Sequence, residues 1–369
     1  MREGWEYKKL NEVCDKGSSN IVINKLIDNN GDYPLYGASG LIKDIDFYHQ
    51  DKRYIGIVKD GAGVGRVNIY PAFSSLVGTM QYIFPKEGYS LDFIKYFLIK
   101  LDLSHCVSGA TIPHIYFKDY GKELIPTPSL DTQLAIVSEL DKINELIRLK
   151  KEQLKDFDNL AQSLFYEMFG DPVENEKGWE VKKLNEIVSD NCSISYGIVQ
   201  PGDGIENGVP VVRPVDMTGT FVYRQGLKNT TKEISESYKR TILKGNEILM
   251  CVRGTTGLIS MASSELRGCN VTRGITPIEC GKSCNKWFIY YQISNSSIQQ
   301  YIAEYTRGIA LKQINMKDVR DIPLCLPPLP LQHLFAQRIE QIEHQKAEVQ
   351  KSITDLETLL ASRMQYWFE

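Results

Sequence analysis

The sequence lacks any apolar stretch of the roughly 18–20 residues that a membrane-spanning helix needs. Its opening residues, Met1 to Trp5, are polar and lack the apolar core of a signal peptide. The eight cysteines are scattered along the 369 residues and show no disulfide framework. We therefore expect a protein with no membrane association, located in the reducing cytoplasm.

Motifs that would carry catalysis are also missing. There is no Gly-x-x-x-x-Gly-Lys-Ser/Thr phosphate loop, and no Asn-Pro-Pro-aromatic or Asp-Pro-Pro-aromatic tetrapeptide of the kind expected in a methyltransferase acting on a base amino group. Residues 61–65 are rich in glycine but lack the following helix and acidic residue of a nucleotide-binding loop, so we interpret them as a turn. None of the five histidines lies in a catalytic context. We predict no catalytic residues.

Two further patterns favour structural roles over metal binding or cleavage. Cys280 and Cys284, with Cys269 nearby, are not spaced as a CxxC pair and have no second pair to complete four ligands. Asp171 followed by Glu180 and Lys182 fits an acid…Glu-x-Lys nuclease pattern that is common by chance. Glu180 and Lys182 also belong to a repeated motif whose first copy has no such aspartate. We therefore expect no metal site.

Strong net positive charge is absent as well, since the formal net charge is −3. The charge is unevenly distributed, however. Residues 131–171 and 329–369 together carry −6, whereas the rest of the chain carries +3. A local excess sets the field near a phosphate backbone, so the charge permits nucleic-acid binding without demanding it.

What the sequence does contain is one unit written twice. The segments 4–12 and 178–186 are related by an offset of 174 and differ only at Tyr7 and Val181. The ends of the halves match at a larger offset of 199, which aligns residues 128–133 with 327–332. The second half therefore has about 25 extra residues in its middle. Similar ends and different middles indicate a shared scaffold that holds two different recognition surfaces.

Each half ends in apolar residues at heptad spacing, with Lys150, Lys346 and Arg363 as exceptions. Two such seams of about five heptads predict long helices that pair as a coiled coil. The alternative is two amphipathic helices that each pack on their own globular domain. The matched registers favour pairing. The predicted seam residues are Ile136, Leu140, Ile143, Ile147, Leu154, Phe157, Leu164, Phe335, Ile339, Ile342, Val349, Ile353, Leu356 and Leu360.

The remaining sequence indicates mixed α and β structure. Residues 54–58 and 247–252 have the pattern of buried strands, and glycine turns follow both at 61–65 and 254–257. Short helices are expected at 91–100 and 285–300. We predict an α+β fold with domains at 1–128 and 172–327 and long helices at 129–171 and 328–369.

The chain resembles the specificity (S) subunit of type I restriction-modification systems. The resemblance rests on the two Gly-Trp-Glu…Lys-Leu openings, on Pro34 to Gly40, and on Gln133 and Gln332 just after the prolines that precede the helices. It covers essentially the whole chain. It departs from the family at Thr132 and Leu331, where a glutamate is usual beside the glutamine.

This resemblance implies two similar α/β target-recognition domains separated by two antiparallel helices, with pseudo-twofold symmetry. Each domain would read one half of a bipartite, asymmetric site in double-stranded DNA. Two modification subunits would supply adenine methylation with S-adenosylmethionine, and restriction subunits would supply translocation and cleavage with ATP and Mg²⁺. This chain itself would hold no cofactor and would not be an enzyme.

The residues best suited to contact DNA are cations, hydroxyls and aromatic residues beside the glycine turns, because phosphates and base edges need such donors and acceptors. The candidates are Tyr36, Ser39, Lys59, Arg66, Thr111, His114, Arg213, Arg224, Arg253, Thr255, Arg273, Arg307 and Lys312.

Three other readings stay open at this point. The first is a specificity subunit of a methylation-only or type II-like system. The second is a coiled-coil scaffold that does not bind DNA. The third, a self-contained DNA enzyme, is disfavoured by the missing motifs.

Overall fold

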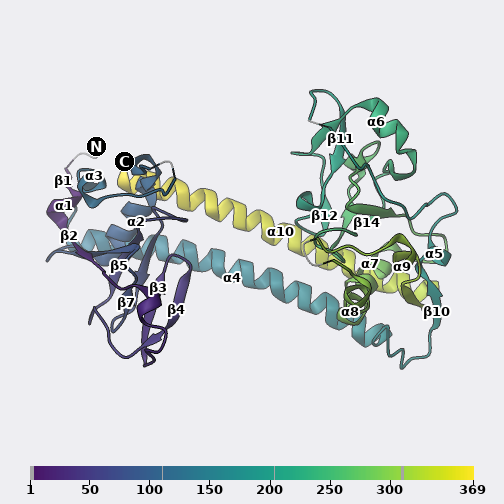
Figure 1. Ribbon diagram of the computed structural model, residues 1–369, viewed down its shortest axis with the longest axis horizontal. Helices are drawn as coiled ribbons and strands as arrows, with labels where there is room; N and C mark the ends of the chain where they lie inside the picture. Colours follow the sequence, from purple (N-terminus) through teal and green to yellow (C-terminus); the bar gives the residue numbers. More distant parts are fainter. Residues whose placement is uncertain (1–3, 110, 203, 309–310) are drawn as a thin grey trace. The chain divides into compact units, whose positions relative to one another are not determined.

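The computed structural model describes residues 4–109, 111–202, 204–308 and 311–369. Residues 1–3, at the start of the first predicted domain, lie outside this described part. The chain forms two compact units, Met1–Glu152 with Gln350–Glu369 (unit 1) and Gln153–Val349 (unit 2). Figure 1 shows the elements of both units. No described helix is both long and apolar enough to cross a membrane.

The described residues of unit 1 form two sheets and one additional strand pair. The larger sheet has the order β2-β8-β5-β6 and is antiparallel, and a second sheet has the order β4-β3-β7. The described elements before the long helix are β1 (Tyr7–Lys9), α1 (Leu10–Val13), β2 (Cys14–Ser18), η1 (Ile23–Lys25), β3 (Tyr33–Gly37), β4 (Gly40–Ile45), β5 (Tyr54–Val58), β6 (Val67–Tyr70), β7 (Ser75–Leu76), β8 (Met80–Pro85), α2 (Leu91–Leu101), η2 (Leu103–Cys106), α3 (Phe117–Tyr120) and β9 (Leu124–Pro126).

Unit 2 is built on the same plan with different strands. Its larger sheet has the order β12-β15-β14-β17, and a second sheet has the order β13-β11-β16. The described elements between the long helices are β10 (Glu180–Lys183), α5 (Leu184–Ile187), β11 (Val209–Val212), η3 (Pro214–Asp216), β12 (Phe221–Val222), β13 (Lys228–Thr230), α6 (Lys232–Ser237), η4 (Lys239–Thr241), β14 (Ile248–Cys251), β15 (Ile259–Ala262), η5 (Ser264–Leu266), β16 (Asn270–Val271), β17 (Ile275–Ile278), α7 (Lys286–Ser294), α8 (Ser296–Tyr305), α9 (Met316–Arg320) and β18 (Pro323–Leu326).

The repeated opening motif folds in the same way in both units. In each, the strand that follows the tryptophan pairs antiparallel with the strand just before the long helix, as β1 with β9 and β10 with β18. A helical turn follows, in which the carboxylate of Glu12 or Glu186 accepts a hydrogen bond from a backbone N–H three residues earlier. This bond satisfies a donor that the first turn leaves unpaired. The motif therefore encodes the closure of each domain.

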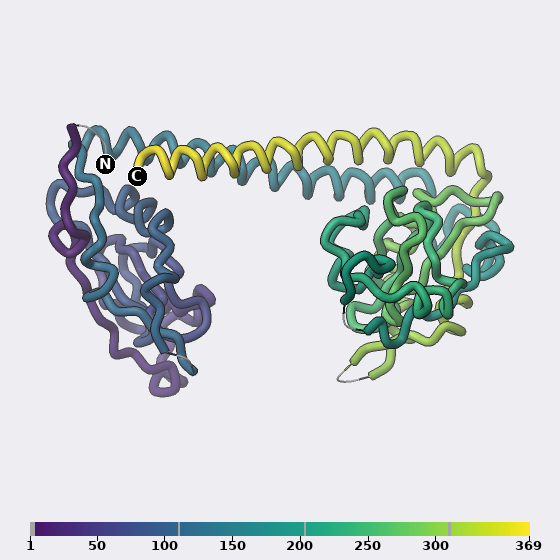
Figure 2. Tube along the Cα trace, turned by 90° about the horizontal axis from the view of Figure 1, so that it is seen from above, coloured from purple at the N-terminus to yellow at the C-terminus, as the bar shows by residue number. Residues whose placement is uncertain are grey.

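The two long helices are α4 (Leu130–Phe169) and α10 (Leu329–Phe368). In unit 1 the first half of α4 runs antiparallel to the end of α10, because Glu139 contacts Arg363 and Lys151 contacts Glu357. In unit 2 the end of α4 likewise runs antiparallel to the start of α10. The predicted pairing of two long helices in a mixed α and β fold is thus confirmed, and Figure 2 shows the paired helices within each unit.

Each long helix also completes the core of the domain beside it, so the alternative of helix-on-domain packing describes part of the structure too. In unit 1, Ile136, Leu140, Met364 and Phe368 are buried with α2 and β5. The equivalent places in unit 2 hold Phe335, Ile339, Phe165 and Phe169. Near the end of α4, Phe165 and Phe169 are thus buried, and Phe165 lies one position beyond Leu164, the predicted seam residue.

Ion pairs accommodate two cations that interrupt the heptad pattern. Within unit 2, Lys346 contacts Asp158 of α4 at 2.7 Å and Glu343 at 2.8 Å. Within unit 1, Arg363 pairs with Glu139, which also accepts a hydrogen bond from the indole of Trp367 at 3.1 Å. Both cations therefore bridge the helices instead of entering an apolar seam uncompensated.

Of the two short predicted helices, one is confirmed and one is corrected. Helix α2 covers the predicted segment at 91–100. The segment 285–300 forms two helices, α7 and α8, instead of one. Asn295 separates them, because its backbone is extended and its side chain accepts a hydrogen bond from Ser297 N at 2.9 Å, which caps α8.

Candidate nucleic-acid interface

In unit 1 the glycine turn after β5 lies against a hairpin whose described residues are 108–109 and 111–114. Gly61 N donates to Pro113 O at 2.8 Å, and Asp60 forms an isolated bridge with His114. Ile115 N then donates to Lys59 O at 2.9 Å. Two segments about 50 residues apart in sequence are thereby joined, and Lys59 and His114 from the predicted set come together.

The hairpin is closed by its own hydrogen bonds. Ser108 and His114 each donate a backbone N–H to the other's carbonyl, at 2.9 and 2.8 Å. Gly109 has φ +92°, and a Cβ there would lie only 2.4 Å from Ile112 O. Only glycine fits this position. Thr111, also predicted, lies exposed on the same hairpin.

A second turn of unit 1 joins this surface through Arg66. The guanidinium of Arg66 donates to Ala38 O at 2.8 Å, which links the glycine turn to the β3–β4 turn that carries Ser39. Tyr36 belongs to β3 and packs against Tyr70, with ring centroids 4.9 Å apart. Arg66 is thus partly engaged in holding two turns together, while the ring of Tyr36 contributes to packing.

Unit 2 repeats the arrangement. Gly254 N donates to Lys312 O at 2.9 Å, and the backbones of Arg253 and Gln313 form an isolated antiparallel β-bridge. Arg307 and Gln313 exchange backbone hydrogen bonds at 2.8 Å each. Gly308 has φ +104° and, like its counterpart, leaves no room for a Cβ. Four predicted residues, including the exposed Thr255 of the turn, are therefore gathered on one surface.

Two residues of this surface were not predicted, namely Tyr196 and Gln313. Gln313 Nε2 donates to the Tyr196 hydroxyl at 3.1 Å, and the guanidinium carbon of Arg273 lies 5.7 Å from the centre of the Tyr196 ring. Among the described residues, the buried Nε of Arg253 finds no hydrogen-bond partner. The alignment of Gln313 with His114 at the offset of 199 was the available signal for Gln313. No local signal pointed to Tyr196.

The other two predicted arginines lie in different settings. Arg213 forms a two-pronged ion pair with Asp216, with contacts of 2.7 and 3.0 Å, and this pairing raises the pKa of the guanidinium. Arg213 precedes Pro214, which packs close to Gly274 and thus beside Arg273. Arg224 is exposed in the segment after β12, where its backbone N–H faces Glu265. The structure does not bring Arg224 to the hairpin.

The groups considered for cleavage or metal binding have structural partners. Asp171 accepts hydrogen bonds from Ser297, Val173 and Glu174. Burial acts to raise the pKa of its carboxyl, but these hydrogen bonds outweigh burial and lower the pKa. Glu180 and Lys182 form an ion pair at 3.3 Å.

One group of possible metal ligands occurs in the described residues, although the sequence predicted none. The side chains of His105, Cys106 and Glu123 lie within 4.8 Å of one another in unit 1. His105 contacts Asp102 O and the Glu123 carboxylate, and both hydrogen bonds raise the pKa of the imidazole. The contact between His105 and Glu123 explains, without a metal ion, why these side chains lie close together.

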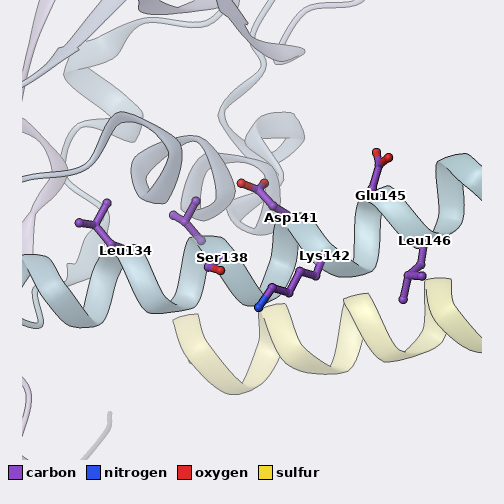
Figure 3. A pocket seen from close by; sticks show the side chains of 7 residues that line it. Leu134, Ser138, Asp141, Lys142, Glu145 and Leu146 are labelled. Carbon is purple, nitrogen blue, oxygen red and sulfur yellow. The ribbon is translucent and has the colours of Figure 1, made fainter.

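A shallow groove runs along α4 in unit 1 (Figure 3). Leu134 and Leu146 are 50% and 47% exposed there, which is high for leucine. Asp141, between them, accepts a hydrogen bond from the hydroxyl of Tyr96 in α2. The helix therefore presents apolar side chains outward while its other face enters the core.

The family model of the type I restriction modification DNA specificity domain matches residues 2–156 and 176–358. The chain belongs to this family. The predicted resemblance to specificity (S) subunits is confirmed by this match and by the relatives. The two matched stretches also agree with the internal repeat.

Relatives within the specificity-subunit family are distant in sequence. The EcoBI specificity subunit of Escherichia coli is 24% identical over 272 residues, which cover 67% of this chain and 57% of the relative. The MjaIX specificity subunit of Methanocaldococcus jannaschii is 22% identical, with 75% and 68% covered. The chain thus spans less than two thirds of the EcoBI subunit's length.

Solved structures of specificity subunits share the fold. The S subunit from M. genitalium aligns over 100% of this chain and 98% of its own, with a TM-score of 0.58 and 15% identity. A chain from a study of assembly and conformational transition of the type I R-M system aligns over the same shares, with a TM-score of 0.58 and 18% identity. At these identities the likeness concerns the fold.

Proposed function

We propose that this specificity-family chain reads a bipartite, asymmetric site in double-stranded DNA and directs methyltransferase and restriction subunits to it. The observation that carries the proposal is the matched surface in the two units, a glycine turn locked to a hairpin. The same backbone framework appears twice with different side chains, as two readers of two different half-sites require.

The chemistry of these surfaces suits DNA. The turn and hairpin of unit 2 carry Arg253, Arg307 and Lys312, and Arg273 lies beside them. Arginine beside glycine can approach a groove closely, and its fork of donors matches guanine edges and phosphates. In unit 1, Thr111 and His114 lie on the matching hairpin, and Lys59 beside it pairs with Asp60 at 2.9 Å.

The long helices suit the role of a spacer. A helix of 40 residues is about 60 Å long. This length exceeds the roughly 34 Å that separates half-sites one turn apart on B-DNA, so the helices are long enough to hold two readers about one turn apart. Two similar halves joined by antiparallel helices would also give a pseudo-twofold relation. Such symmetry fits two copies of a modification subunit, one for each half-site.

Cofactors would be held by the partners. S-adenosylmethionine would serve the modification subunits in the cytoplasm, and ATP with Mg²⁺ would serve the restriction subunits. The exposed leucines along α4, such as Leu134 and Leu146, provide apolar area for docking a partner subunit. The same chain could serve a methylation-only system, in which no restriction subunit would co-purify.

The decisive experiment is sequencing of methylated adenines in the host with and without this gene. We expect a two-part motif with a fixed gap that disappears on deletion and returns on complementation. The purified chain alone should transfer no labelled methyl group to DNA, cleave no DNA and hydrolyse no ATP. Loss of the gene without any change in methylation would refute the proposal.

A salt titration separates this proposal from a protein-binding scaffold. DNA affinity of the chain together with its modification subunit should fall steeply as salt rises, because phosphate contacts release counterions. The chain and its modification subunit could co-purify and yet show no salt-dependent binding to DNA. That result would favour the scaffold that binds protein only.

A further inference from the structure

Position 114 in unit 1 and position 313 in unit 2 occupy the same place on the same backbone framework. In unit 1, the N–H and C=O of His114 are both used by Ser108. In unit 2, the N–H and C=O of Gln313 are both used by Arg307. The residue before each accepts a hydrogen bond from the glycine turn, at 2.8 and 2.9 Å. The framework thus fixes the backbone, and the side chain is what differs.

The neighbours along the chain direct these two side chains outward. Ile115 and Ile314, the next residues, are 1% and 0% exposed in their domain cores and donate their N–H to the carbonyl before the glycine turn. Successive side chains in an extended segment alternate between faces. His114 and Gln313 therefore face away from the core, and both are partly exposed.

The free hydrogen-bonding groups of Gln313 are those of a base reader. One N–H of its amide is held by Tyr196, which fixes the orientation of the amide plane. Within the described part of the chain, the amide oxygen and the second N–H have no partner, which keeps one acceptor and one donor available. Adenine presents the complementary pair, N6–H and N7, in the major groove.

His114 is oriented by a different local contact. Its Nδ1 lies 3.1 Å from Ile112 O, and a carbonyl can only accept, so Nδ1–H is the donor. In the neutral imidazole with this tautomer, the other ring nitrogen, Nε2, is a single acceptor. The two matched positions thus present different hydrogen-bonding patterns on the same framework.

We infer that residues 114 and 313 are the paired specificity-determining positions of the two domains, and that Gln313 reads an A·T pair in its half-site. The inference rests on the proposed function. His114 determines one position of the other half-site. In each domain the glycine turn, the hairpin and the buried isoleucine fix the backbone. The side chain at position 114 or 313 determines which base pair is read.

The test uses the intact gene with its partner genes in the host, and methylated-adenine sequencing as readout. Gln313→Ala should relax one A·T position in one half-site, with discrimination falling about 5- to 150-fold, and leave the other half-site unchanged. Gln313→Glu keeps the size of the side chain but offers only acceptors. It should shift the preference at that position toward cytosine, whose N4 amine is a donor.

His114→Ala should relax one position of the opposite half-site. The matched control is Gln300→Ala, which removes an exposed glutamine from α8 and should leave the motif intact. An unchanged motif in both Gln313 variants would overturn the inference while leaving the proposed function in place. A wild-type gene that yields no two-part motif would refute the proposed function itself.

Discussion

At the scale of single residues, two buried glutamines perform the same task in the two units. Gln133 and Gln332 each accept a hydrogen bond from the residue that precedes a helix of the domain, Ser90 or Asn285, and donate to the carbonyl of a proline before the long helix. Each therefore fastens the start of a long helix to its domain. The glutamines that contributed to the family resemblance thus have a physical role.

Replacing Gln332 by leucine should destabilise unit 2 by about 2–4 kcal/mol, because it leaves two buried backbone groups without partners. Urea unfolding followed by circular dichroism measures the change. The control is Gln345→Leu, an exposed position on the same helix. Equal midpoints for the two variants would contradict the role assigned to Gln332.

Arginines and lysines of the unit 2 surface should separate into two classes. If Arg253 contacts a base, Arg253→Ala should cost about 1–3 kcal/mol and relax one position of the site. If Lys312 contacts a phosphate, Lys312→Ala should weaken binding to all sequences and lower the salt slope by about 1. Binding to matched and mismatched duplexes at several salt concentrations distinguishes the two. The same response from both variants would argue against this division.

The sequence predicted arginines of this surface from their position beside glycine turns, but it does not show which turns meet in the folded domain. Cations beside glycines mark turns that can approach a groove, and Arg253 and Arg307 do lie on joined turns. The sequence alone does not show which turns meet, because Gly254 and Lys312 are joined by a long-range hydrogen bond. Tyr196 was missed for the same reason, since its partners are distant in sequence.

At the scale of elements, a pH-dependent contact joins α4 and α10 in unit 1. Hydrogen bonds from Arg363 and Trp367 lower the pKa of Glu139 below its ordinary value of 4.5. A carboxyl with a lowered folded-state pKa stabilises the protein above its unfolded pKa and loses that contribution as pH falls through the folded pKa. Glu139 is about one third exposed, so the effect is modest.

We expect Glu139→Gln to cost about 0.5–1 kcal/mol at neutral pH and to remove part of the stability that wild type loses below pH 4.5. Thermal unfolding between pH 7 and pH 3 measures both. Glu145→Gln, on the same helix in the exposed pair with Arg148, should have a smaller effect at neutral pH. Indistinguishable curves for wild type and Glu139→Gln would refute the assigned contact.

Shortening both helices should change the gap between half-sites. Removing residues 147–153 together with 350–356 takes one heptad from each helix, about 10 Å, or roughly three base pairs. Methylation sequencing should show the same half-sites with a shorter gap. Removing only one heptad should misalign Glu139 with Arg363 or Asp158 with Lys346 and abolish assembly. An unchanged gap after the paired deletion would exclude a spacing role.

The long helices were the most predictable elements, because about five heptads of apolar residues outweigh local variation. Their packing was less predictable. The heptad pattern indicated Leu164 as the buried residue. Phe165 is buried instead, because its ring packs among aromatic side chains of unit 2. The single helix expected at 285–300 breaks at Asn295, where a capping side chain competes with helix continuation.

At the scale of the whole molecule, the middle of each domain should be exchangeable. Residues 187–315 lie between the repeated opening and the closing strand of unit 2, as the internal repeat defines them. Replacing this segment with that of a related specificity subunit should change one half of the methylated motif and leave the other half intact. If both halves changed together, the two domains would not read DNA independently.

The division of the chain between the two units has a consequence for biosynthesis. Unit 2 is one continuous stretch, whereas unit 1 needs residues 350–369 to supply Met364 and Phe368 to its core. On the ribosome, the domain translated first is therefore the domain completed last. Until those twenty residues emerge, its apolar surface stays open to chaperones and proteases. Premature stop codons near residue 350 should thus leave the amino-terminal domain, not the neighbouring one, open to degradation.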